Sequence, residues 1–364
     1  MRPCGLIPRP AGHGAAFLSL QQKVFMRVWF NRTFSSVYAA IDLIREADTD
    51  GRFHIIHSNP NARTPAARLA HEFHSEPTGL EPEQYVEWCL AFCREQRVDI
   101  FVPGREATLL AGFHARFEAI GTRVLSAALE PALLFIHDKA RFYAETVLPG
   151  APVAEFRRFE DAAGFEEAYD QLRRRHVKLC VKPSHSIYGL GFAVLDEERN
   201  AAQLLMAGAE YHVSLADFRR GLVEMGTFRT MLLMEYLDGR EYSVDCVGDR
   251  GRLVTAVVRR KSGQSGAGQR IDQRADILEA TAQLCSTHGL NGIFNVQFKE
   301  AGGHPRLLEI NPRMSGGIGM ACIAGPNLPY IALRGFADGF DGLDIAPVRN
   351  GMRVGEQARA VELT

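Results

Sequence analysis

Short apolar runs alternate with amphipathic stretches over the first third of the chain. The runs at 27–30, 53–57 and 100–103 have the length of buried strands, and the apolar positions between them recur with helical spacing. Strands that alternate with helices predict an open parallel sheet, with its ligand crevice at the carboxyl ends of the strands. The polar residues expected at those ends are Asn31, Arg32, Arg105 and Glu106.

Glu106 is open to two interpretations. A carboxylate just past a central strand can hold an amino group or a metal ion. It can equally be an acid at the start of a helix that follows Pro103 and Gly104, where it favours the helix dipole.

Two apolar runs near residue 300 predict a hairpin with one polar face. Residues 293–298 and 306–310 flank a turn that contains two adjacent glycines. Because side chains alternate along a strand, one face would carry Ile293, Asn295, Gln297, Leu307, Glu309 and Asn311. Carboxylate and amide oxygens suit Mg²⁺, and Arg313 just beyond them can meet phosphate oxygens in a fork. A solvated polar face without a ligand would show the same pattern.

Two further loops carry candidate chemistry. The loop at 183–191, rich in Ser and Gly, could fold its amides over phosphates or simply close a hairpin. It is no phosphate loop of the G-x-x-x-x-G-K-[ST] kind, which occurs nowhere in the chain. Arg259, Arg260 and Lys261 precede the loop SGQSGAGQR, where they could clamp a substrate carboxylate or acyl phosphate, or protect a sheet edge.

Composition narrows the class of protein. A chain of 364 residues predicts two or three packed units, and a net charge of −1 gives no global attraction to nucleic acid or to anionic membrane. Small polar or anionic metabolites are the better partners. Seven cysteines without a C-x-x-C pair indicate reduced thiols and a cytoplasmic location, and Cys89 and Cys93 lie in an apolar run typical of a core. No apolar run reaches the length of a membrane span.

The hairpin carries a family resemblance. FNVQF followed by LLEINPRMSGG resembles the metal-binding hairpin of ATP-grasp enzymes, most closely the synthetase halves of the carbamoyl phosphate synthase large subunit. The resemblance implies that Gln297, Glu309 and Asn311 coordinate Mg²⁺ or Mn²⁺ on the phosphates of ATP. It implies that Arg313 faces the transferred phosphoryl group.

The resemblance continues over residues 131–340, with four motifs in the family order. It implies that Lys139 reaches the phosphates, Lys182 the α-phosphate and adenine side, and Glu241 the ribose hydroxyls. The remaining residues implied to bind the nucleotide are Ser184, Gly189, Gly191, Glu235, Tyr236 and Leu237. His185, Ile187 and Tyr188 make the phosphate-covering loop bulkier than in biotin carboxylase-like members.

The implied fold is α/β, with the nucleotide between a small and a large ATP-grasp lobe. We expect a disordered extension at 1–25, a Rossmann-like domain at 26–130, the small lobe at 131–230, the large lobe at 231–345 and a C-terminal segment at 346–364.

The implied activity is that of an ADP-forming carboxylate-amine ligase. It would activate a small carboxylic acid, for instance an amino acid, as an acyl phosphate and join it to an amine. Arg259, Lys261 and Arg313 are the catalytic candidates. The substrates are expected among Asn31, Arg32, Glu106, Ser315, Gly316 and Gly317. Carbamoyl- or carboxy-phosphate synthesis and a non-catalytic nucleotide-binding module are the alternatives, and relatives of this kind are often homodimers.

Overall fold

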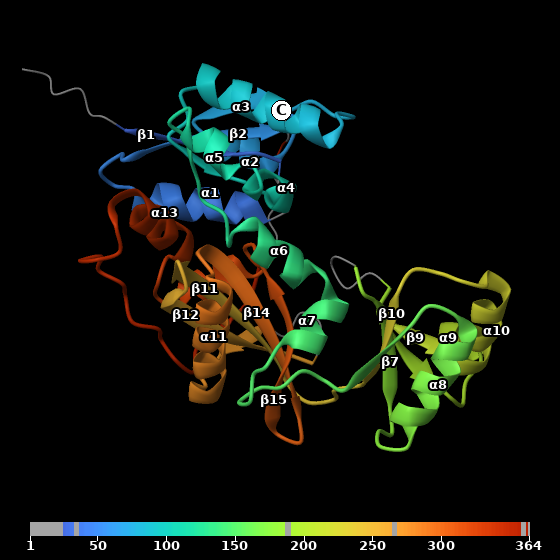
Figure 1. The fold of residues 1–364 in the computed structure, drawn as a ribbon. Coiled ribbons are helices and arrows are strands. Elements are labelled where there is room, and N and C mark those ends of the chain that lie inside the picture. Colours follow the sequence, from blue (N-terminus) through green and yellow to red (C-terminus); the bar gives the residue numbers. More distant parts are fainter. Residues whose placement is uncertain (1–24, 33–35, 186–190, 264–267, 358–361, 363–364) are drawn as a thin grey trace, which may run out of the picture.

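The computed structural model describes residues 25–32, 36–185, 191–263, 268–357 and 362. They form three sheets in successive parts of the chain, β1–β5, β6–β10 and β11–β16, and we call these parts the first domain, the small lobe and the large lobe (Figure 1). No helix in the described part of the chain is long and apolar enough to cross a membrane.

The first domain is a parallel sheet with helices on both faces. Its strand order is β3-β2-β1-β4-β5. The strands are β1 (Met26–Phe30), β2 (Phe53–Asn59), β3 (Glu72–Ser75), β4 (Ile100–Val102) and β5 (Arg123–Val124). The helices are α1 (Ser36–Ala47), α2 (Pro65–Leu69), α3 (Pro82–Glu95), α4 (Ala107–Ala111) and α5 (His114–Glu118).

Alternation along the central strands divides the core of this domain. Trp29 and Phe101 pack towards α3, whereas Val28 and Ile100 pack towards α1. The strand order reverses between β1 and β4, so the loops after these two strands meet at a topological switch point. The predicted open parallel sheet is confirmed.

The small lobe is a five-stranded sheet with helices packed on one face. Its order is β6-β10-β7-β8-β9. The strands are β6 (Phe156–Phe159), β7 (Leu179–Pro183), β8 (Ala193–Asp196), β9 (His212–Ser214) and β10 (Met231–Glu235). The helices are α8 (Ala162–Arg173), α9 (Ala201–Met206) and α10 (Leu215–Met225), and two further helices, α6 (Glu130–His137) and α7 (Lys139–Glu145), lead into this lobe.

The large lobe is an antiparallel sheet in the order β15-β14-β11-β12-β13-β16. The strands are β11 (Glu241–Asp249), β12 (Arg252–Lys261), β13 (Gln269–Ile271), β14 (Gly292–Ala301), β15 (His304–Asn311) and β16 (Arg353–Val354). The helices are α11 (Ala275–His288), α12 (Ile318–Ile323) and α13 (Leu328–Asp338). Since β16 pairs with β13, the C-terminal segment contributes a strand to this sheet.

The first domain is docked on the large lobe through α1 and α13 (Figure 1). Asn327, at the start of α13, donates to the carbonyl oxygen of Leu43 at 2.7 Å. Arg52 and Asp338 form an ion pair across the same contact. These contacts place the carboxyl ends of the first sheet's strands close to Asn311, at the end of β15.

Candidate functional site

A cleft of about 620 Å³ lies where the first domain, α6, α7 and β15 meet. The first domain contributes Arg32, Arg105 and Glu106 to its lining. The other charged and polar residues around it include His137, Lys139, Glu309, Asn311 and Arg313. Residues predicted to bind metal, phosphate and substrate come from opposite ends of the sequence, and in the structure they line one cleft.

The predicted metal ligands lie together on the β14–β15 hairpin. Gln297 is the cross-strand neighbour of Glu309. Asn311 donates from Nδ2 to Glu309 Oε1 at 3.1 Å, and Arg313 Nη2 lies 3.4 Å from Asn311 Oδ1. One carboxylate and two amide oxygens on adjacent strands are a donor set that fits a hard divalent cation. No cluster of three or more His, Cys, Asp or Glu side chains suited to a metal occurs among the described residues.

The hairpin contains a β-bulge that the alternation argument did not anticipate. Gln297 pairs with Glu309 but the next residue, Phe298, pairs with Leu307, so Leu308 is the extra residue. Leu307 is fully buried in the core with Phe298. The prediction that Leu307 shares the polar face of Glu309 was wrong, because a bulge breaks the two-residue period.

Two lysines converge on Glu309. Lys139 Nζ lies 3.5 Å from Glu309 Oε2, and Asp138 caps α7 by accepting the amides of Ala140 and Arg141 at 3.1 Å each. Burial lowers the pKa of Lys139 and of Lys182. Burial acts to raise the pKa of Glu309, but the charges of the two lysines outweigh it, so this pKa lies below its ordinary value.

The two described ends of the loop predicted to cover the phosphates are held by close contacts. The amide of Lys139 donates to the carbonyl oxygen of Ser184 at 3.2 Å, which ties the loop to the start of α7. Gly191 has φ of +81°, and a Cβ there would lie 2.8 Å from Pro183 Cγ, so only glycine fits. Gly189 lies outside the described residues.

The predicted adenine-binding segment follows β10 directly. The amides of Glu235 and Tyr236 donate to the carbonyl oxygens of Glu155 and Lys178 at 2.9 Å and 3.0 Å. Because these two donors are engaged, the amide of Leu237 is the candidate donor for a purine.

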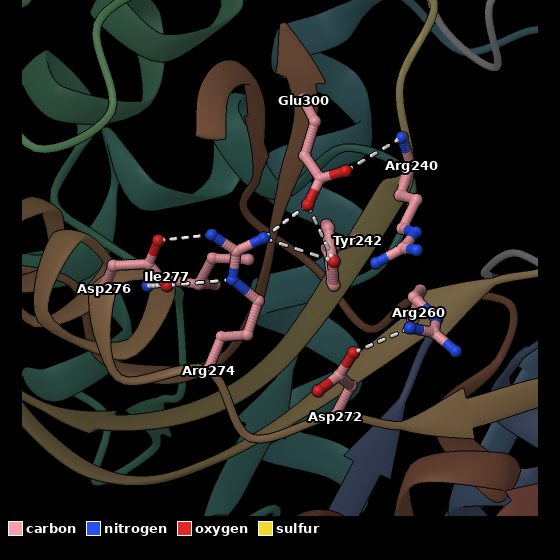
Figure 2. A network of polar contacts seen from close by, with 8 residues as sticks. All are labelled: Arg240, Tyr242, Arg260, Asp272, Arg274, Asp276, Ile277 and Glu300. Atoms are coloured by element: carbon pink, nitrogen blue, oxygen red, sulfur yellow. Dashed lines mark hydrogen bonds and ion pairs between the residues drawn. The ribbon is translucent and has the colours of Figure 1, made fainter. Parts of the chain in front are cut away.

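The crossover between the lobes consists of residues 236–240, which join β10 to β11. A polar network that the sequence did not reveal holds its second half in place. Figure 2 shows Glu300 at its centre, accepting from Tyr242 Oη at 3.0 Å and paired with Arg274. Glu300 also accepts the amide of Arg240 at 3.3 Å, and its carbonyl oxygen accepts the amide of Gly239 at 3.2 Å. A Cβ on Gly239 would lie 2.6 Å from Glu300 Cβ. The crossover is therefore held against β14.

A second ion pair in the same view joins β12 to the segment before α11. Arg260 Nη1 meets Asp272 Oδ2 at 3.2 Å, beside the start of α11 (Figure 2). Lys261, the next residue, pairs with Glu241, the residue predicted to accept the ribose.

Arg259 occupies a different environment from its neighbours. Its side chain is 2% exposed and its Nε lies 2.7 Å from Asp245 Oδ2. Nη2 donates to Ser315 Oγ at 2.9 Å, and a Cβ on Gly317 would lie 2.5 Å from Nη1. The Arg259 guanidinium therefore packs against the turn at 315–317 and holds it in place. Among the described residues lining the cleft, Arg313 is present whereas Arg259 and Lys261 are not.

Arg32 lines the cleft from the first domain, and a buried carboxylate holds its guanidinium. Its Nε lies 3.0 Å from Glu76 Oε1, and the Glu76 side chain is 0% exposed. Burial raises the pKa of Glu76, which also accepts from Ser58 and Tyr85 at 2.8 Å each. Arg32 Nη2 lies 3.6 Å from Glu106 Oε1. Sequence reasoning missed Glu76, because β3 lacks the apolar run that would have marked a strand end.

Asn31 plays a supporting part in the same region. It is fully buried, donates to Tyr85 Oη at 2.8 Å and accepts the amide of Gly104 at 2.6 Å. It fixes the loop after β4 from beneath rather than lining the cleft.

The sequence and the fold resemble those of known proteins. A family model described as "ATP-grasp in the biosynthetic pathway with Ter operon" matches residues 227–360. Carnosine synthase 1 of Gallus gallus is 33% identical over 163 residues, which are 40% of this chain and 17% of that protein. The carbamoyl phosphate synthase large chain of Clostridium beijerinckii is 25% identical over 162 residues, 41% of this chain and 14% of that protein.

The structure of N5-carboxyaminoimidazole ribonucleotide synthetase in complex with ADP matches with a TM-score of 0.64 at 13% identity, covering 91% of this chain and 81% of that one. Residues 227–360 thus match an ATP-grasp family model, and most of the chain has the fold of ATP-grasp enzymes. The resemblance and the fold class predicted from the sequence are confirmed. The matched segments span only 13% to 17% of the carnosine synthase chains.

Two further ATP-grasp structures share the fold. L-amino acid ligase from Bacillus licheniformis matches with a TM-score of 0.57 at 13% identity, covering 85% of this chain and 73% of that one. The biotin carboxylase domain dimer of Hydrogenobacter thermophilus 2-oxoglutarate carboxylase, in complex with MgADP and bicarbonate, gives 0.61 at 15% identity, covering 86% and 70%.

Proposed function

We propose that this ATP-grasp chain is an ADP-forming ligase that activates a small carboxylic acid and joins it to an amine. The observation that carries the proposal is Glu309, set among Gln297, Asn311 and Lys139 in a cleft that opens to Arg32 of another domain. Magnesium-nucleotide chemistry needs such oxygen ligands and cations, and a ligase needs additional room for two substrates. The relatives named as ligases and synthetases support the same class.

Gln297, Glu309 and Asn311 would hold Mg²⁺ or Mn²⁺ with ATP, and the ion withdraws charge from the phosphate oxygens when it is bound. Lys139 and Arg313 add positive charge beside them. A substrate carboxylate oxygen bonds to the γ-phosphorus while the bond to the bridging oxygen breaks, releasing ADP. The amine nitrogen then bonds to the acyl carbon, phosphate leaves with the electrons of the carbon–oxygen bond, and the amine proton passes to solvent.

The first domain is the proposed substrate side of the cleft. Arg32 and Arg105 can receive a carboxylate, and Glu106 can receive an ammonium group, which suits an amino acid. The buried ion pair with Glu76 fixes the guanidinium of Arg32 before any ligand arrives.

We also propose an assembly and a cellular location. The biotin carboxylase domain neighbour is a dimer, and a homodimer is proposed here, which light scattering would test. Six described cysteines are free buried thiols, consistent with the reducing conditions of the cytoplasm.

The test is ADP release from Mg-ATP with pools of carboxylic acids and amines. We expect release that requires one member of each pool, and a loss of at least about a hundredfold in Glu309→Gln at unchanged folding. ADP release in no pool, or unchanged release by Glu309→Gln, would sink the ligase proposal.

Carboxy-phosphate chemistry is the second candidate. It is favoured by the likeness to the carbamoyl phosphate synthase large chain and by the neighbour that holds bicarbonate. Adding bicarbonate in place of the carboxylic acid pool separates the two, because only a carboxy-phosphate enzyme would then release ADP. A nucleotide-binding module without turnover would bind ADP and release none from ATP.

A further inference from the structure

Tyr143 joins three elements beside the proposed phosphate site. Its ring is buried on α7, with 3% exposed, and packs against Phe156 of β6 at 5.6 Å between ring centres. Its hydroxyl donates to the carbonyl oxygen of Leu308 on β15. Lys182 of β7 donates from Nζ to the same hydroxyl at 2.6 Å. In Figure 1, α7 lies between the large-lobe hairpin and the small lobe.

The β-bulge supplies the carbonyl group that Tyr143 uses. Leu308 is the extra residue of the bulge, so it has no cross-strand partner in the register of β14 and β15. The next residue is Glu309. The hydroxyl of Tyr143 is therefore bound to the backbone at the point where the metal-binding face begins.

The hydroxyl also determines how Lys182 is held. A tyrosine hydroxyl has one hydrogen to donate, and here it is given to the Leu308 carbonyl oxygen. Its oxygen then faces Lys182 as an acceptor, which suits an ammonium group. Lys182 Nζ also lies 4.5 Å from the centre of the Tyr143 ring, within the range of a cation–π contact.

We propose that Tyr143 is a positioning residue that sets the Lys182 ammonium for the phosphates of a nucleotide, in register with the strand that carries Glu309. This inference rests on the proposed nucleotide site and extends it. The ligand class concerned is a nucleoside di- or triphosphate. Adenosine lacks phosphate and could use only the adenine side of the Lys182 contact.

The test compares ADP with adenosine in binding titrations of the full chain. Tyr143→Phe keeps the ring and removes the hydroxyl, so we expect ADP to bind about tenfold more weakly and adenosine to lose much less affinity than ADP. Equal weakening of both ligands would mean a role in packing alone and would overturn the proposal. Unchanged ADP binding would overturn it as well.

Tyr169→Phe is the matched control. Tyr169 lies in the small lobe, donates to Glu197 Oε1 at 2.8 Å and lies 4.6 Å from the guanidinium of Arg219. Like Tyr143, it donates a hydrogen bond from its hydroxyl and makes a cation–π contact through its ring, but it lies on α8, away from the proposed site. We expect its substitution to leave ADP binding unchanged, and weakening equal to that of Tyr143→Phe would contradict the assignment.

A double substitution adds a second measurement. If Tyr143 acts through Lys182, adding Tyr143→Phe to Lys182→Met should weaken ADP no further than Lys182→Met alone. Fully additive losses would contradict the proposal. Failure of the unmodified protein to bind ADP would instead remove the proposed nucleotide site, so the two failures are distinguishable.

Discussion

At the scale of single residues, three of the cations in and near the cleft are held by carboxylates in close pairs. The pairs are Lys139 with Glu309, Lys261 with Glu241, and Arg259 with Asp245. A partly exposed pair can exchange its partner for a metal ion or a phosphate at small cost. A buried pair cannot, because separating its charges leaves one of them without solvent or partner.

Arg259 provides a test of that distinction. Arg259→Met leaves the fully buried Asp245 unpaired, and we expect the free energy of unfolding to fall by about 3 to 5 kcal/mol in urea titrations. Arg260→Met is the matched control. Its ion pair with Asp272 is partly exposed, with 27% and 29% of the side chains accessible, so a loss of less than about 1 kcal/mol is expected. Equal losses in both variants would contradict a structural role for Arg259.

Spacing in the sequence predicted contacts between site residues that are close together along the chain. Glu309 and Asn311 are two residues apart on one strand, and alternation alone puts them on one face. Tyr143 and Leu308 are separated by 165 residues, and Arg32 and Glu76 by 44. Contacts of that kind depend on how the domains pack, so the supporting residues Tyr143 and Glu76 could not be found from spacing.

At the scale of elements, two short features decide the geometry of the site. The bulge in β15 turns Leu307 into the core and gives the Leu308 carbonyl oxygen to Tyr143. The crossover at Gly239 and Arg240 is held against Glu300 of β14 (Figure 2). A bulge and a close backbone approach leave little trace in apolar periodicity, whereas the long strands and helices were predicted from it.

The crossover makes a prediction at this scale. Gly239→Ala forces a Cβ to within 2.6 Å of Glu300, so we expect a loss of about 1 to 3 kcal/mol in unfolding free energy and weaker ADP binding. Gly221→Ala is the control, since a Cβ there meets nothing within 4 Å and Gly221 lies inside α10. Alanine should stabilise that helix by about 0.5 to 1 kcal/mol. A Gly239 variant as stable as the control would contradict the close approach.

At the scale of the whole molecule, the cleft is shared between domains. The first domain is fixed to the large lobe through α1 and α13, whereas the small lobe joins the rest through the segments after α7 and β10 (Figure 1). This arrangement places Arg32 and Glu309 around one cleft. Lys182 belongs to the small lobe and contacts Tyr143 of α7. The order of the domains followed from the family resemblance, but their docking required the structure.

The central claim is that a substrate carboxylate receives the γ-phosphoryl group of ATP in this cleft. Its most direct test uses a carboxylic acid labelled with heavy oxygen, chosen from the acids that support ADP release, and follows the label by phosphorus NMR. We predict that one labelled oxygen appears in the inorganic phosphate for each ADP formed, because the acyl phosphate breaks at its carbon–oxygen bond when the amine attacks. Inorganic phosphate free of label, at full ADP release, would contradict the account.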